Sequence, residues 1–344
     1  MGNLGKQTIS FPNKPYIISA YSLGGKKESE GPLRDWFDDC LRDDIYGEAT
    51  WEKAESKMLK TAVTETVRRS GKGLDEVGAM LSGDLLNQLM SSSFMARDMR
   101  IPFLGMYGAC STMTESLIMG SVLVDGRYSN NVIIGASSHY CTAERQFRMP
   151  LEHGNQRPPS AQWTATAAGT MMISSESTNE DIDVIVESAT IGKVIDAGIK
   201  SANKMGSAMT PAAVDTLLNH LEDTNRNLDY YDIVLTGDLG FTGREIMKDL
   251  LQDAGLDKKA IDERYDDCGA MIYKPEQDVH SGGSGCGCSA STFAGYVYKK
   301  MKRGEIKRAL IMSTGALLST ISPFQGESIP GIAHAVSLQS RPKN

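Results

Sequence analysis

The sequence has no run of about 20 apolar residues, so no segment is long enough to cross a bilayer as a helix. The N-terminal segment also lacks the apolar stretch of a signal peptide, and we expect synthesis in the cytosol. Basic residues are few, since 36 Lys and Arg stand against 43 Asp and Glu. Proteins that grip phosphate backbones carry a positive surface, so nucleic acid is excluded as a principal partner.

Cysteine is sparse as well. The six cysteines are scattered, and the one close pair, Cys286 and Cys288, has neither a second pair nor a His at ligand spacing. A structural zinc site needs four such ligands, so we expect free thiols, no metal site and no cofactor of the protein's own. The acidic run 35–44 lacks the Gly and Glu spacing of an EF-hand calcium loop, and we interpret it as a solvated segment.

What the chain does contain is a repeat. Leu74–Gln88 matches Leu228–Thr242 without a gap, and both run from a short apolar strand into a turn. Gly108–Ser138 then matches Cys286–Ala316, with Cys110 opposite Cys288. Two matches in the same order predict an internal duplication, which fits a length of 344 residues better than one large core does.

Three short, continuous apolar runs predict strands of a parallel sheet covered by helices on both faces: Val132–Gly135, Ile233–Thr236 and Ala309–Met312. Helices are predicted over 52–70, over 211–221 with Thr210 as N-cap and Pro211 as first residue, and over 243–254. We therefore expect two similar α/β halves, 1–180 and 181–344, related by a pseudo-twofold axis.

Cys110 lies on a turn of small residues just before a predicted helix of about 16 residues. Free backbone N–H groups and the positive end of the helix dipole would then point at the thiol. Both effects favour a thiolate, and the same geometry also binds anions without any reaction. A free cysteine in a strand–helix turn is as often a packing residue, so local evidence leaves both interpretations open.

The segment around Cys110, followed by NNVIIGASSHY, resembles the nucleophile segment of thiolases and of ketoacyl-ACP synthase III-like condensing enzymes. The later run GCGCSASTFAGYVYKKMKRGEIKRALIMSTGA resembles their Gly-Asn-x-Ser segment. The resemblance covers essentially the whole chain. It implies a thiolase-like α/β fold, in which two duplicated βαβαβαββ halves form a five-layered αβαβα arrangement, and a homodimer.

The chain departs from these enzymes at the partners of the thiol. Where the resemblance implies a His after the strand at 233–236, Thr236 or Gly237 stands, and Cys286 takes the place of the Asn. In the thiolase pattern, Ser284 takes the place of a His and Ser313 that of a second Cys. We therefore expect no catalysis, unless a loop returns a histidine to Cys110; His280 and His334 are the candidates.

Within the superfamily, YGACSTMTESLIMGSVLVDGRYSNNVIIGASSHYCTAERQFRMPLE, RPPSAQWTATAAG and SIPGIAHAV resemble a stage V sporulation branch from endospore-forming bacteria. The resemblance implies a component that binds dipicolinic acid, alone or with calcium, for its uptake into the developing spore. It also implies a peripheral place on the spore inner membrane beside other stage V sporulation A-type membrane proteins. Two alternatives stay open, an acyltransferase with Cys110 as nucleophile and a scaffold whose pocket is vestigial.

Dipicolinate is flat and doubly negative, so it needs a slot with donors aimed at both carboxylates. Donors are predicted at the helix start, at the end of the following strand, in the loop after it, where Arg145 and Arg157 also lie, and before the next strand. The ligand-binding candidates are Cys110, Ser111, Ser137, Ser138, His139, Arg148, Gln162 and Thr164.

Overall fold

The computed structural model describes residues 2–147, 157–178 and 181–343. Its strands form two groups of five with the same order. The first group runs β5 (Phe103–Gly105), β4 (Ala79–Gly83), β6 (Asn131–Ser138), β8 (Ala167–Ser174) and β2 (Tyr16–Gly24). The second runs β11 (Tyr265–Asp267), β10 (Ile233–Thr236), β13 (Arg308–Ala316), β14 (Gly331–Pro342) and β9 (Ile182–Thr190). In each group the first three strands are parallel and the fourth is antiparallel to the third.

The two groups join where β2 pairs with β9, through two residue pairs, Tyr16 with Ile185 and Ile17 with Val184. The short strands β1 (Thr8–Ser10) and β3 (Asp39–Cys40) add to β9 and β2. A separate parallel pair, β7 (Trp163–Thr164) with β12 (Gly283–Ser284), links segments from the two halves of the chain. The predicted boundary at residue 180 falls between β8 and β9, on residues 179–180 that the structure does not describe.

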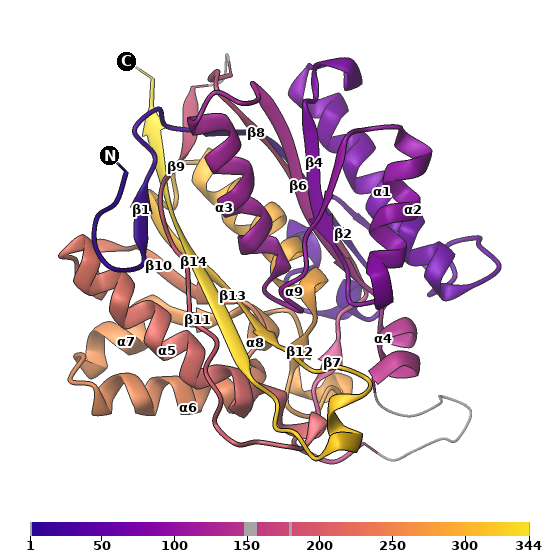
Figure 1. The fold of residues 1–344 in the computed structure, drawn as a ribbon, viewed down its shortest axis with the longest axis vertical. Helices are drawn as coiled ribbons and strands as arrows, with labels where there is room; N and C mark the ends of the chain where they lie inside the picture. The colour runs from indigo at the N-terminus through magenta and orange to yellow at the C-terminus, as the bar shows by residue number, and fades with distance from the viewer. Residues whose placement is uncertain (1, 148–156, 179–180, 344) are drawn as a thin grey trace.

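The helices complete five layers, which are seen from the side in Figure 1. α1 (Trp51–Ser70) and α2 (Met90–Met99) cover the outer face of the first group, and α5 (Met205–Thr224) and α6 (Gly240–Asp253) that of the second. Between the groups lie α3 (Thr112–Asp125), which contacts β6 and β4 on one side and β13 and β14 on the other, and α9 (Cys286–Thr292). The thiolase-like α/β prediction is confirmed. The shorter helices are α4 (Tyr140–Phe147), α7 (Lys258–Arg264), α8 (Cys268–Met271) and α10 (Tyr298–Lys302).

The three predicted strands are present because their apolar runs are buried on both faces. The predicted start of α5 is wrong. The helix begins at Met205, so Pro211 lies inside it and Thr210 is not its N-cap. Pro211 removes one backbone hydrogen bond there, while the Thr210 hydroxyl donates to the carbonyl of Gly206 (2.7 Å). No helix within the described ranges is both long and apolar enough to span a membrane.

A buried acid ties the first half to the second. Glu28 follows β2, and its carboxyl accepts hydrogen bonds from the Tyr273 hydroxyl and from the backbone N–H of Thr166 (3.0 Å). Its second oxygen has no partner among the described residues. Lys27 Nζ donates to the carbonyl of Gln277 (2.6 Å), and Gln277 Nε2 donates back to that of Lys27 (2.7 Å). Burial raises the pKa of Glu28 to about 7.

We expect this acid to make the protein less stable as the pH rises. A carboxyl whose pKa is raised by folding weakens the folded state as the pH climbs from its ordinary pKa toward its folded one. The variant Glu28→Gln cannot ionise, so its free energy of unfolding should gain about 2 kcal/mol on that of the wild type between pH 5 and pH 8. Urea unfolding followed by circular dichroism at the two pH values measures this difference.

The matched control is Glu30→Gln, at an exposed position on the same short helix. The free energy of unfolding of this variant should differ from that of the wild type by the same amount at pH 5 and at pH 8. A constant difference for Glu28→Gln too would show that folding leaves the pKa of Glu28 at its ordinary value.

Candidate functional site

Cys110 sits where the sequence predicted, on a tight turn directly before α3. The turn is closed by the side chains that follow it, because the Ser111 hydroxyl donates to the carbonyl of Gly108 and the Thr112 hydroxyl to that of Ala109, both at 2.7 Å. Ala109 adopts a left-handed conformation with φ of 52°, which is uncommon for a residue with a side chain. A strained turn of this kind fixes the direction of the cysteine side chain.

The thiol borders a small pocket between the two halves. Its lining is mostly apolar, and hydroxyl groups come from Tyr107, Thr164 and Ser284. The space open to the centres of water-sized molecules is about 40 Å³, enough for roughly three waters. Thr164 and Ser284 are paired neighbours in β7 and β12, so the polar wall combines the two halves. The lining residues are Leu85, Tyr107, Ala109, Cys110, Ala143, Phe147, Thr164, Met205, Ser284, Ala316 and Leu318.

Behind the thiol lies a carboxyl group that sequence reasoning did not single out. Asp238, just after β10, is fully buried and hydrogen-bonds the Cys110 thiol. The Thr314 hydroxyl and the backbone N–H of Gly285 (3.3 Å) also donate to it. Gln162 Nε2 holds the backbone here, donating to the carbonyls of Asp238 (2.7 Å) and Gly283 (2.8 Å). The partner of Cys110 is therefore an acid two residues after Thr236.

This environment makes Cys110 a poor nucleophile. Burial first, and then the charge of Asp238, raise the pKa of the Cys110 thiol well above its ordinary value. A hydrogen bond from the Gly285 N–H acts in the opposite direction but is weaker. The prediction that the helix start lowers this pKa is wrong, because burial and the neighbouring Asp238 raise it. Burial raises the pKa of Asp238 itself to about 7.

Three predicted serines lie near the thiol but are engaged with other groups. The Ser111 hydroxyl closes the turn, as described above. Ser137, on β6, donates to Glu55 on α1 (3.3 Å). Ser138 donates to the carbonyl of Ala165 (2.7 Å) and accepts from the N–H of Gly287 (3.0 Å). None of the three lines the pocket.

The remaining predicted residues divide as follows. Thr164 lines the pocket together with Cys110, while Gln162 stands behind it. His139 Nε2 bonds the carbonyl of Asp44 (2.8 Å), and burial lowers its pKa. Arg148 lies outside the described residues. The loop arginines pair with acids, Arg145 with Glu52 (3.0 Å) and Arg157 with Asp278 (3.2 Å).

The histidines within the described ranges all have partners away from Cys110. His280 Nδ1 bonds the carbonyl of Pro158 (2.8 Å), and His334 Nδ1 accepts from the N–H of Gly192 (3.1 Å). His220 bonds Thr190 (2.7 Å) and Tyr231 (2.6 Å) in the core. At the positions implied by the resemblance, Cys286 donates to the carbonyl of Ser137 (2.9 Å) and Ser313 to Ser289 (3.0 Å).

A pair of buried acids, Glu55 and Asp84, lies in the first half. Asp84, at the end of β4, accepts from the N–H groups of Leu86 (2.9 Å) and Ser92 (2.7 Å), and Glu55 faces it from α1. Burial and the charge of Asp84 raise the pKa of Glu55. The repeat aligns Asp84 with Asp238, so the sequence indicated that the two acids occupy equivalent places in the two halves. No group of three or more His, Cys, Asp or Glu is placed to hold a metal ion in 2–147, 157–178 and 181–343.

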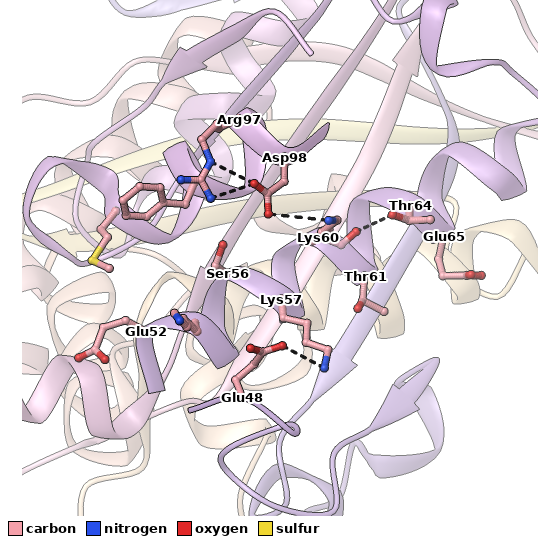
Figure 2. Close-up of a pocket in the computed structure, with 13 residues that line it drawn as sticks. Glu48, Glu52, Ser56, Lys57, Lys60, Thr61, Thr64, Glu65, Arg97 and Asp98 are labelled. Atoms are coloured by element: carbon pink, nitrogen blue, oxygen red, sulfur yellow. Dashed lines mark hydrogen bonds and ion pairs between the residues drawn. The ribbon is translucent and has the colours of Figure 1, made fainter. Parts of the chain in front are cut away.

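The surface also has a wide groove between α1 and α2, with a volume of about 780 Å³ (Figure 2). Its lining has as many acids as cations. Lys57 pairs with Glu48 (3.1 Å), and Asp98 pairs with both Arg97 (2.9 Å) and Lys60 (3.8 Å). Exposed pairs of this kind contribute little binding energy and leave no excess charge for an anion. The small pocket at Cys110 is the better candidate.

Comparisons with known proteins give a family and a fold. The family model described as Stage V sporulation protein AD matches residues 5–339. The protein of that description from Bacillus subtilis (strain 168) is 42% identical over 332 residues, which cover 96% of this chain and 96% of that protein.

Two solved structures have the same fold at low sequence identity. 3-Oxoacyl-[acyl-carrier-protein] synthase III from Aquifex aeolicus VF5 is 11% identical with a TM-score of 0.58, covering 94% of this chain and 99% of its own. Human mitochondrial 3-ketoacyl-CoA thiolase in complex with CoA is 12% identical with a TM-score of 0.58, covering 96% of this chain and 99% of its own. At these identities the likeness shows the fold alone.

The acidic neighbour predicts slow chemistry at Cys110. In the native protein at pH 7.5, iodoacetamide should label the partly exposed Cys40 first and leave the buried Cys110 free. The variant Asp238→Asn removes the repelling charge, so labelling of Cys110 should rise about tenfold. Peptide mass spectrometry over time measures both rates, with Cys110→Ser to assign the peptide. Labelling of native Cys110 as fast as Cys40 contradicts the assignment of a protonated thiol.

Proposed function

The chain belongs to the Stage V sporulation protein AD family, and from that premise we propose that it is a non-catalytic protein that binds a small dicarboxylate, dipicolinic acid, in the Cys110 pocket. The observation that carries the proposal is the partner of the thiol. A condensing enzyme needs a group that accepts a proton and donors that hold a thioester oxygen. Burial, and after it Asp238, instead favour the protonated Cys110 thiol, which borders a pocket.

The lining suits a flat ring with polar edges. Leu85, Phe147 and Leu318 offer apolar surface to an aromatic face, and Thr164 and Ser284 offer hydroxyl donors at one wall. The space is far smaller than the ligand, so binding requires side chains at the apolar rim to move outward. The proposal therefore includes an opening step, and it predicts slow association relative to a preformed site.

We also propose the setting implied by the family: a peripheral position at the spore inner membrane, beside stage V sporulation A-type membrane proteins, with the chain as a homodimer. Calcium, where it takes part, enters with the ligand's carboxylates. Titrations with and without calcium distinguish binding of dipicolinate alone from binding of dipicolinate together with calcium.

Isothermal titration of the purified protein with dipicolinate tests the binding. The wild type should give saturable heat, and Thr164→Val, which keeps the shape but removes the hydroxyl, should weaken binding about tenfold. Cys40→Ser, remote from the pocket, is the matched control and should bind as the wild type does. Absence of saturable heat at any calcium concentration rejects the proposal.

The acyltransferase alternative has its own test. Incubation with acyl-CoA donors followed by intact mass spectrometry should show no adduct on the wild type, as on Cys110→Ser. An adduct that forms on the wild type and is missing from Cys110→Ser would establish Cys110 as a nucleophile and overturn the non-catalytic assignment.

A further inference from the structure

The charges around the pocket conflict with an anionic ligand. None of the residues that line it in the described part of the chain is cationic. The acid next to it is Asp238, whose carboxyl interacts with the Cys110 thiol. The same carboxyl accepts a hydrogen bond from the backbone N–H of Gly285, the residue that follows Ser284 of the lining. Burial, and then the carboxyls of Glu55 and Asp84, raise the pKa of Cys286, so acids also lie on the side of this thiol. A dicarboxylate entering here meets acids without a counter-charge.

The groups that face Asp238 offer no compensation. Thr314 and the Gly285 N–H donate to it, and the titratable neighbours that the structure describes are thiols or acids. The titratable neighbours are Cys110 before α3, Cys286 and Cys288 on α9, Cys268 on α8 and Asp267 on β11. Since no cation stands in this shell among residues 2–147, 157–178 and 181–343, the direct way to remove the repulsion is to neutralise Asp238 with a proton.

Protonation also changes what the thiol can do. When Asp238 is ionised, the Cys110 S–H donates to its carboxylate and is turned away from the ligand. When Asp238 carries the proton, its carboxyl is a weaker acceptor, so the S–H is held less firmly and becomes more available to the pocket that Cys110 lines. A buried carboxylic acid kept neutral in an apolar site is an established way to accommodate an anion.

We infer that the pocket accepts a dicarboxylate only when Asp238 is protonated, so that binding takes up one proton from solvent. The inference rests on the proposed function, because it takes a dicarboxylate as the ligand of the Cys110 pocket. One proton passes from water to an Asp238 carboxylate oxygen, and no covalent bond forms with the ligand. Asp238 thereby decides at which pH the site is open to its ligand, and Cys110 acts as a neutral donor.

The test is titration of the wild type with dipicolinate in calcium-free solution at pH 6 and pH 8. The ligand's own carboxyls stay ionised over this range. Burial raises the pKa of Asp238 to about 7, so the dissociation constant should be about tenfold higher at pH 8 than at pH 6. At pH 8, heats measured in Tris and in HEPES, which differ in ionisation enthalpy, should reveal uptake of nearly one proton per ligand.

Two variants sharpen the result. Asp238→Asn cannot titrate, so its dissociation constant should be equal at pH 6 and pH 8 and its proton uptake absent. Asp266→Asn removes an acid that pairs with Arg244 outside the pocket, and it should keep the wild-type pH dependence. If Asp238→Asn does not fold, the proton uptake of the wild type still decides the question.

The failures can be told apart. Saturable binding with the same dissociation constant at both pH values and no proton uptake overturns the role of Asp238 and leaves the proposed function standing. Absence of binding at pH 6 overturns the proposed function, and the protonation inference falls with it.

Discussion

The contact between the Cys110 thiol and the Asp238 carboxyl sets the character of the whole site. It joins a turn of the first half to the end of a strand of the second, so it forms only when the two halves are packed together. It replaces the positive or neutral base that would activate a thiol with a group that repels a thiolate. A thiolase-like fold is thereby combined with a thiol whose pKa is raised.

Much of the fold could be predicted from the sequence because it is written in local signals. The repeat between 74–88 and 228–242 anticipated two groups of strands in the same order, and buried apolar runs marked β6, β10 and β13. The position of Cys110 before a helix followed from small residues and a periodic stretch. The start of α5 was predicted wrongly at Pro211, because a proline inside a helix and one at its first position look alike without tertiary context.

The site was harder to predict because its key residues meet through tertiary packing. Asp238 stands in the segment where the resemblance implies a histidine, and its match with Asp84 in the repeat was the available signal. A carboxyl after a strand usually faces solvent, so burial beside Cys110 could not be inferred from spacing. The polar residues chosen for their type, such as Ser138, His139 and Gln162, satisfy backbone groups instead. Buried hydroxyls and amides have to find such partners, and composition does not say which.

The small parallel pair β7–β12 has a consequence for how a molecule could reach Cys110. Backbone hydrogen bonds from Trp163 to Gly282 and from Ala165 to Ser284, both 2.8 Å, fasten this wall across the two halves, and Gln162 braces it from behind. Parting the halves would break all of them at once. The side chains of Phe147, Met205 and Leu318, which also line the pocket, are apolar and form no such bonds. A molecule that displaced them would break packing contacts only, whereas the β7–β12 wall would stay in place.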